Sequence, residues 1–190
     1  MPRPNAENAI HLNADQLQAG LEKILLSPKD NGILELVVRR PEIEQRETLD
    51  RAELNTVEGL IGDNWLRRGA SHTAHGSADP EMQLNIMNAR AIALIATCKE
   101  RWPLAGDQLY IDLDLSNNNL PAGTRLKVGS ALIEVTGVPH LGCKKFVSRF
   151  GLAAMKFVNS KLGKQHNLRG INAKVVESGV INIGDTVSKI

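Results

Sequence analysis

The stretch TRLKVGSALIEVTGV, residues 124–138, decides the fold. Apolar and β-branched residues on both sides of Gly129 predict two strands, 124–128 and 130–138, joined by a tight turn. Similar runs predict further strands both earlier and later in the chain. The expected ranges are 33–38, 83–87, 108–115, 173–178, 180–183 and 185–190. In the strand 108–115, alternate leucine and isoleucine residues should share one buried face.

Helices are expected between these strands. Asn13 and Gln16 form a capping box for a helix that ends before Pro28. Residues 46–68 are mixed and allow a helix ending near Trp65, and a further helix spans about 89–100. The helix after Cys143 is either continuous to about Lys161 or restarts after Ser148. Its expected apolar stripe is Phe146, Phe150, Ala153 and Phe157, beside a basic stripe of Lys145, Arg149 and Lys156.

Short strands, glycine turns and interrupting helices favour a mixed, β-rich fold, a β-barrel with added α-helices. Strands and helices do not alternate regularly, and no glycine-rich phosphate loop is present, so a doubly wound sheet is not expected. One domain should span residues 1–190, with an N-terminal helical arm (1–32) and a barrel with inserted helices (33–190).

Composition is consistent with a soluble cytoplasmic protein. Apolar residues make up 42% of the chain and aromatic residues 3%, so the core must be mostly aliphatic. The first thirteen residues lack the apolar run of a secretory signal, and no run is long enough to span a membrane. Of the two cysteines, Cys98 has helical core spacing with Ile95 and Trp102, and it is expected to be a small buried residue.

Charge is distributed unevenly along the chain. Residues 135–176 contain eight of the 23 basic residues and no Asp or Glu, which leaves 15 basic and 21 acidic residues elsewhere. Such a segment could be a solvated face, but soluble faces usually interleave both signs. We therefore expect it to attract an anionic ligand. Duplex DNA is a weaker alternative, since no helix-turn-helix, zinc finger or aromatic RNA platform is visible.

Cys143 is the strongest candidate for chemistry. It stands at the head of the basic segment, where nearby cations and a following helix favour the thiolate, the form that attacks electrophiles, carries sulfur or binds soft metals. An inert cysteine at a strand-to-helix turn is the alternative. His140 could act as its base or could be a surface residue after Pro139. His72 and His75 form a weaker pair that lacks a third metal ligand at fixed spacing.

Four segments in order resemble the MOSC domain, the C-terminal domain of molybdenum cofactor sulfurases. They are PLAGDQL (103–109), LPAGTRLKVG (120–129), ALIEVT (131–136) and HLGCKK (140–145). Three further segments, RFG (149–151), KFVN (156–159) and LRGINA (168–173), resemble a small stand-alone bacterial subgroup. The resemblance covers the chain from about residue 33 onward.

The resemblance implies a β-rich barrel and one key cysteine, Cys143, that carries sulfur or contacts the molybdenum of the pterin cofactor. That cofactor bears a phosphate, which suits the basic segment. From the order of these motifs and the acid-free segment together, we expect the anion to be held by Lys144, Lys145, Arg149 and Arg169, and the pocket to be lined by Asp107 and Gln108. Some family members take part in molybdenum-dependent reduction of N-hydroxylated compounds.

The sequence departs from the family pattern in ways that bear on activity. No pyridoxal-phosphate desulfurase domain and no electron-transfer domain is recognised, so an active enzyme would need a cysteine desulfurase or a redox partner protein. The common Gly-Glu-Asn-Leu element is replaced by Gly106-Asp107-Gln108-Leu109. Two hypotheses therefore stand: a protein that binds a molybdenum- or sulfur-containing anion, or a non-catalytic module that binds a protein or nucleic acid through its basic face.

Overall fold

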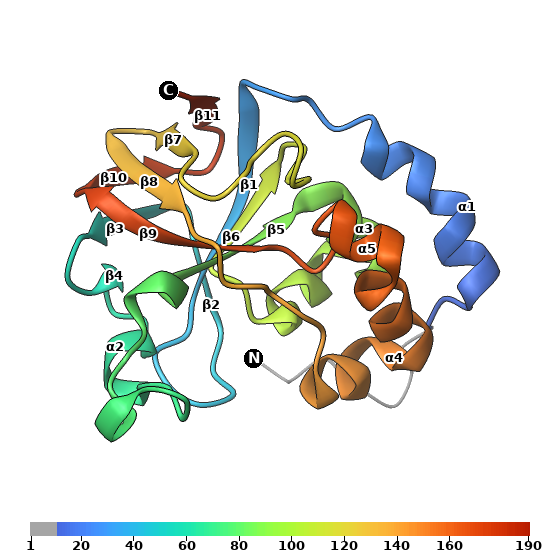
Figure 1. Ribbon diagram of the computed structural model, residues 1–190, viewed down its shortest axis with the longest axis horizontal. Coiled ribbons are helices and arrows are strands. Elements are labelled where there is room, and N and C mark those ends of the chain that lie inside the picture. The colour runs from blue at the N-terminus through green and yellow to red at the C-terminus, as the bar shows by residue number, and fades with distance from the viewer. Residues whose placement is uncertain (1–10) are drawn as a thin grey trace.

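Seven strands close into a β-barrel in the computed structural model, which describes residues 11–190 (Figure 1). The ring runs β11–β7–β8–β9–β5–β6–β1 and closes where β1 pairs with β11. Only β5 and β6 are parallel, and every other pairing in the ring is antiparallel. The ring strands are β1 (Gly32–Arg39), β5 (Leu84–Asn88), β6 (Leu109–Asp112), β7 (Arg125–Val128), β8 (Ala131–Val135), β9 (Ile171–Glu177) and β11 (Thr186–Lys189). This confirms the β-rich barrel expected from the sequence.

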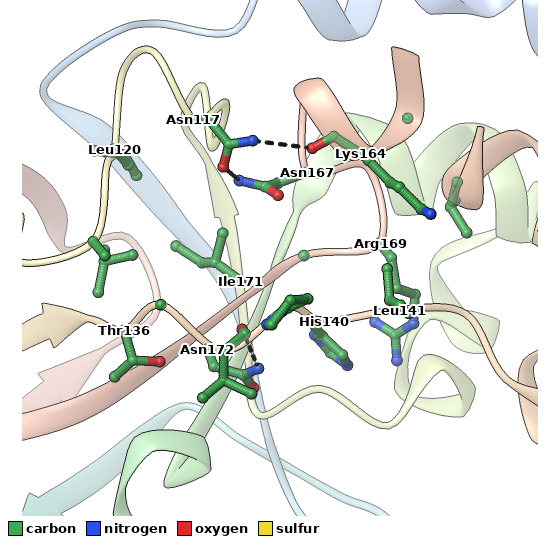
Figure 2. A pocket seen from close by; sticks show the side chains of 18 residues that line it. Asn117, Leu120, Thr136, His140, Leu141, Lys164, Asn167, Arg169, Ile171 and Asn172 are labelled. Atoms are coloured by element: carbon green, nitrogen blue, oxygen red, sulfur yellow. Dashed lines mark hydrogen bonds between the residues drawn. The ribbon is translucent and has the colours of Figure 1, made fainter. Parts of the chain in front are cut away.

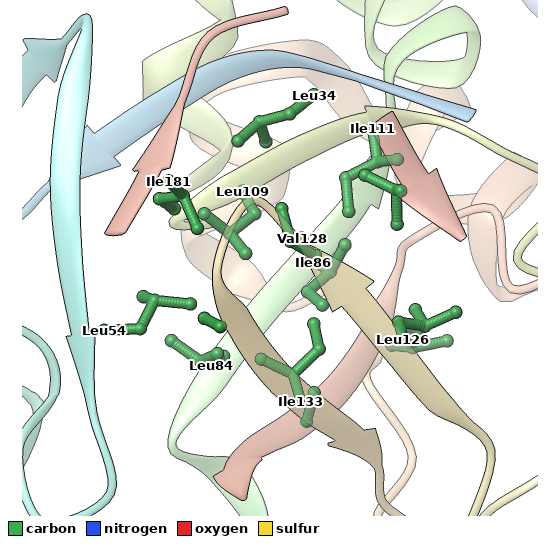
Figure 3. Close-up of a cluster of buried hydrophobic side chains, with 14 of the residues drawn as sticks. Leu34, Leu54, Leu84, Ile86, Leu109, Ile111, Leu126, Val128, Ile133 and Ile181 are labelled. Atoms are coloured by element: carbon green, nitrogen blue, oxygen red, sulfur yellow. The ribbon is translucent and has the colours of Figure 1, made fainter. Parts of the chain in front are cut away.

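A smaller sheet lies against the barrel at the left of Figure 1. It consists of β10 (Gly179–Asn182), β3 (Arg51–Asn55) and β4 (Gly59–Leu60), while β2 (Glu47–Leu49) extends the main sheet beside β1. Leu54, Leu60 and Ile181 join the buried aliphatic cluster that fills the barrel. Figure 3 shows this cluster, to which Leu109 and Ile111 of β6 contribute. The predicted face of residues 109, 111, 113 and 115 is therefore confirmed as core.

The hairpin that decides the fold has a two-residue turn at Gly129 and Ser130. Val128 pairs with Ala131 across the turn, and Gly129 has a φ of +55°. A side chain there would also clash with the carbonyl oxygen of Val180. Glycine is required at this position on both grounds, the left-handed backbone and the close approach of β10.

The larger helices cover one side of the barrel (Figure 1). They are α1 (Ala14–Leu25), α3 (Ala89–Ala96), α4 (Lys144–Asn159) and α5 (Lys161–Gln165). Outward-facing Val38, Met87 and Tyr110 of β1, β5 and β6 are buried with these helices in a second cluster. Because strand side chains alternate in direction, three strands supply two cores at once. The capping box of Asn13 and Gln16 at α1 is confirmed.

Several expectations about local structure are wrong. Residues 46–68 form the three strands β2, β3 and β4, and the short helix α2 (Trp65–Arg68) begins where a helix was expected to end. Helix α3 stops at Ala96 because Thr97 takes the left-handed conformation, with φ of 64°. Cys98 then precedes the 3₁₀ helix η4 (Lys99–Ala105) and is exposed, so it is no core residue. Two more 3₁₀ turns are η2 (Ala74–Gly76) and η3 (Pro80–Met82).

Helix α4 is interrupted at Gly151, with φ of 86° and ψ of 164°, and Ser148 causes no break. Phe146 and Phe150 are buried as expected, but the interruption shifts the periodicity that follows. Ala154 and Val158 are buried in place of the expected Ala153 and Phe157. Ser160 then caps α5 with its hydroxyl. Consequently Lys156 lies in a groove beside Leu152, away from Lys145 and Arg149.

Helix α1 belongs to the second core and packs against α3 and α4. Residues 1–10 of the expected N-terminal arm lie outside the described part of the chain. No helix within residues 11–190 combines the length and the apolar character that crossing a bilayer requires.

Candidate functional site

Cys143 borders a cavity of about 190 Å³ whose charged lining residues are mostly cationic. Five guanidinium groups line it, from Arg40, Arg46, Arg68, Arg149 and Arg169, together with the ammonium group of Lys145. His140, Asn64 and Asn85 also line the cavity, and Glu42 and Glu44 are its acidic members. Such a concentration of positive charge in a concave site favours an anionic ligand.

Cys143 is held at the edge of this cavity by its neighbours. It is the residue immediately before α4, it is exposed, and its side chain makes no capping hydrogen bond. The side chain of Asn159 fixes the preceding residue, Gly142, from both sides. Its Oδ1 accepts from the Gly142 amide at 2.8 Å, and its Nδ2 donates to the Gly142 carbonyl at 2.9 Å. The main chain next to Cys143 is therefore held in place, while the thiol itself makes no capping hydrogen bond.

One side of the cavity is built on a buried ion pair between Arg40 and Asp63. Nε and Nη2 of Arg40 donate to the two carboxylate oxygens at 2.9 and 2.8 Å. Nη1 donates to Oδ1 of Asn85 at 3.0 Å and to the carbonyl of Gly106 at 2.7 Å. Each of the three side-chain nitrogens of Arg40 already donates to the protein, so its main role is to shape the wall and to contribute charge.

A second buried pair joins Arg169 to Asp107, whose side chain is fully buried. Nη1 of Arg169 lies 2.9 and 2.8 Å from the two carboxylate oxygens, and Nη2 donates to the Ala105 carbonyl at 2.9 Å. Burial raises the pKa of Asp107, and the guanidinium of Arg169 opposes that rise. Asp107 was expected to line the pocket, but it lies beneath the cavity and holds Arg169 in place.

His140 lies against this pair. Its Nδ1 is 3.4 Å from Oδ1 of Asp107, but the alignment does not make a hydrogen bond. Burial, followed by the charges of Arg169 and Arg40, holds the pKa of His140 well below its usual value of 6.5. The imidazole is therefore neutral at neutral pH, as a base must be.

The pH dependence of stability should reveal His140. In the unfolded chain the imidazole takes up a proton below pH 6.5, whereas in the folded protein it resists protonation. The unfolded state then binds more protons, so stability falls as the pH drops from 7.5 to 5.5. We expect the melting temperature of His140→Gln to fall less over that pH range than the melting temperature of the wild type. His75→Gln, in an exposed loop, is the control and should behave like the wild type.

Among residues 11–190, Glu44 is the only carboxylate that contacts Arg149 or Lys145, two of the cations that line the cavity. It accepts from Nη2 of Arg149 at 2.6 Å and lies 3.5 Å from Nζ of Lys145. Its backbone is in the left-handed region, with φ of 62°. That conformation is unfavourable for glutamate, and the surrounding loop must hold it. The carboxylate of Glu44 thus occupies cations that an incoming anion would need.

Replacing Glu44 with glutamine should tighten anion binding. The exposed pairs with Arg149 and Lys145 are each worth under about 1 kcal/mol, so we expect phosphate affinity to rise roughly 2- to 5-fold. Isothermal titration calorimetry at low salt would measure the change. Glu47→Gln disrupts a pair with Arg39 outside the cavity and should leave phosphate affinity unchanged. Equal gains in both variants would show only a general charge effect.

Arg46 and Arg68 were missed by sequence reasoning. Within the described part of the chain, neither guanidinium lies within 4 Å of a carboxylate. Burial, then the charges of Arg149 and Arg40, lower the pKa of Arg46. Burial, then the charge of Arg40, lower the pKa of Arg68, so both guanidinium groups lie partly buried among other cations without a direct carboxylate partner among residues 11–190. Both lie outside the basic segment, in a stretch read as mixed, and no local motif marks them.

Three buried polar atoms near this cavity lack a hydrogen-bond partner. They are Oδ1 of Asn64, Nδ1 of His140 and Nε of Arg169, and no others are found among the described side chains. All three residues line the cavity. Unsatisfied buried groups cost free energy and are rare in folded proteins, so their concentration at one place indicates a site built for a ligand.

The remaining candidates lie elsewhere. Lys144 is exposed and does not line the cavity. Gln108 also does not line it, because its amide is used to hold the main chain: Oε1 accepts from the Asn85 amide at 2.7 Å, and Nε2 donates to Gln83. His72 bonds Asp79 at 2.8 Å, and no group of three potential metal-binding side chains occurs among residues 11–190.

The eight cations of the basic segment do not gather on one surface. Lys145, Arg149 and Arg169 line the cavity, and Lys164 lines a neighbouring one. Lys174 is paired with Glu81 at 2.8 Å and with Glu134 at 3.5 Å. This scatter provides little continuous positive surface of the kind that duplex DNA requires.

A barrel with one thiol beside a cationic cavity defines a recognisable class of protein. Residues 75–188, more than half of the chain, match the model of the MOSC domain. The chain therefore belongs to the MOSC domain family.

Solved structures agree with this assignment at the level of fold. The YuaD protein from Bacillus subtilis superposes with a TM-score of 0.61 at 17% identity, over 83% of this chain and 94% of that one. YiiM from Escherichia coli gives 0.52 at 18% identity, covering 83% and 69%. YiiM from Geobacillus stearothermophilus gives 0.51 at 13% identity, covering 85% and 73%. No curated protein matches the chain.

Proposed function

We propose that this protein binds the molybdenum cofactor in the cavity beside Cys143, with the thiol as metal ligand or sulfur carrier. The observation that carries the proposal is the combination of five guanidinium groups, an unengaged thiol and three unpaired buried polar atoms around one cavity. Membership of the MOSC family supports the choice of cofactor.

The residues fit such a group chemically. Arg46 and Arg68, which lack carboxylate partners, would hold the phosphate, because guanidinium groups bind phosphate oxygens bidentately. Arg149 and Lys145 would add to this once Glu44 is displaced. The thiol of Cys143 is the soft donor that a molybdenum centre or a sulfane sulfur requires. When bound, the molybdenum centre would supply reducing equivalents to a substrate.

The chain's own groups would orient that chemistry. Neutral His140, buried against Asp107, could accept a proton near the thiol, and the Arg169–Asp107 pair would keep its ring in place. We therefore propose His140 as the base and Cys143 as the reactive group, with a desulfurase or redox protein as partner. A cytoplasmic location fits such partners and completes the proposal.

The test uses protein purified from a molybdenum-replete host. We expect molybdenum and a pterin in amounts comparable to the protein, and a loss of roughly 100-fold in retained pterin in an Arg46→Gln, Arg68→Gln variant that removes two phosphate ligands. Arg67→Gln, at an exposed pair with Glu42, is the matched control. Absence of molybdenum, pterin and any additional sulfur on Cys143 would refute the proposal.

The second hypothesis, a non-catalytic binding module, gains little from the geometry. Its basic face is divided among separate sites, as the placement of Lys145, Lys164 and Lys174 illustrates. A strongly salt-dependent affinity for nucleic acid would nevertheless favour it over cofactor binding.

A further inference from the structure

A larger cavity, of about 430 Å³, lies beside the one that contains Cys143. The two cavities share His140 and Arg169 as lining residues. The second is formed by the end of β8, the segment after it, the start of β9 and helix α5 (Figure 2). Nothing in the proposed function uses this space.

The charges that line the second cavity are positive. In the described part of the chain, Lys164 and Arg169 are its charged side chains, and neither Asp nor Glu lines it. Within residues 11–190, Nζ of Lys164 has no carboxylate within 4 Å and no hydrogen-bond partner. Arg169 keeps Nε unpaired after its other nitrogens bond Asp107 and Ala105. An unpaired cation in a concave site favours an anionic head group.

The rest of the wall is largely apolar. Leu120, Val135 and Ile171 line it from the barrel side, and all three are buried. Leu141 lines the same cavity and is 47% exposed, which leaves apolar surface open to solvent. Figure 2 shows Leu141 beside Arg169 and His140, and Asn117 and Asn167 at the opposite end. An inorganic anion would leave this surface uncovered, whereas an organic anion would bury it.

We propose that the second cavity binds a small organic anion, a carboxylate or sulfonate with an apolar body. Its acid group meets Lys164, and its body packs on Leu120, Val135 and Leu141. His140 forms part of both cavities, so a molecule bound here lies next to the group at Cys143. A role for the organic anion as a reactant with the group at Cys143 rests on the proposed function. Its binding in the second cavity does not.

Binding can be tested with 4-phenylbutyrate and its neutral amide, by calorimetry or ligand-observed NMR. We expect the acid to bind roughly 2- to 5-fold more tightly than the amide, because the amide keeps an acceptor oxygen but lacks the negative charge that pairs with the exposed Lys164. Lys164→Gln should abolish that difference, and Ala122→Phe should block both ligands by filling the cavity. Lys161→Gln, on the same helix but not lining the cavity, is the control. Equal binding of acid and amide, or no effect of Lys164→Gln, would overturn the proposal.

Adjacency to Cys143 has its own readout. Saturating 4-phenylbutyrate should slow alkylation of Cys143 by iodoacetamide severalfold and leave the exposed Cys98 unaffected. Ala122→Phe should remove the protection. Unchanged alkylation would overturn the adjacency. Retained 4-phenylbutyrate binding in a protein that never holds molybdenum would refute only the cofactor proposal, while retained molybdenum without 4-phenylbutyrate binding would refute only this inference.

Discussion

Replacing Cys143 with serine should lower the molybdenum or sulfane sulfur content of the purified protein at least about 100-fold, because it removes the only soft donor that borders the cavity among residues 11–190. Folding should be unaffected, since the thiol is exposed and makes no capping hydrogen bond. Serine is also a favourable residue before a helix. We expect the melting temperature to stay within about 2 °C of the wild type.

Cys98→Ser is the matched control, because Cys98 is also exposed but lines no part of the cavity. It should keep full metal and sulfur content. Mass spectrometry of the native protein separates the two roles of Cys143: additional sulfur indicates a carrier, and molybdenum without it indicates a ligand. Equal content in Cys143→Ser and the wild type would exclude both roles.

Replacing Asp107 with asparagine should cost about 3–5 kcal/mol in the free energy of unfolding. The substitution leaves the guanidinium of Arg169 buried without its counter-charge, and Asp107 is itself fully buried. Urea denaturation would measure the loss. Glu81→Gln, which weakens the exposed pair with Lys174, should cost less than about 1 kcal/mol.

A double variant distinguishes a structural pair from general packing damage. Asp107→Leu with Arg169→Met removes both charges, so its cost should be well below the sum of the two single substitutions. An additive result, or a loss under about 1 kcal/mol for Asp107→Asn, would show that the pair does not support this wall of the cavity.

The barrel could be predicted from sequence because its signals are local. Gly129 between two apolar runs marks a hairpin whatever surrounds it, and the alternation from Leu109 to Leu115 marks a buried strand face. Strand β3 was less clear. Buried Ala52 and Leu54 alternate with exposed Arg51 and Glu53, but all four residue types also favour helices. That alternation was the signal that could have identified the strand.

The cavity could be predicted only in part because its walls come from distant segments. Arg149, Arg169 and Cys143 share the basic segment, so charge counting found them. Arg40 and Arg68 reach the cavity through β1 and α2, and only the closed barrel brings them there. Cys98 illustrates the reverse error, since one left-handed residue at Thr97 moved an apparently buried side chain into solvent.

Closure of the ring through β11 has a consequence for aggregation. Residues 186–189 complete the ring by pairing with β7 and with the first ring strand, more than 150 positions earlier. Until residues 186–189 take their place, the edges of β1 and β7 that they cover remain unpaired and open to aggregation. A variant that weakens β11 would therefore expose two strand edges at once, and not one.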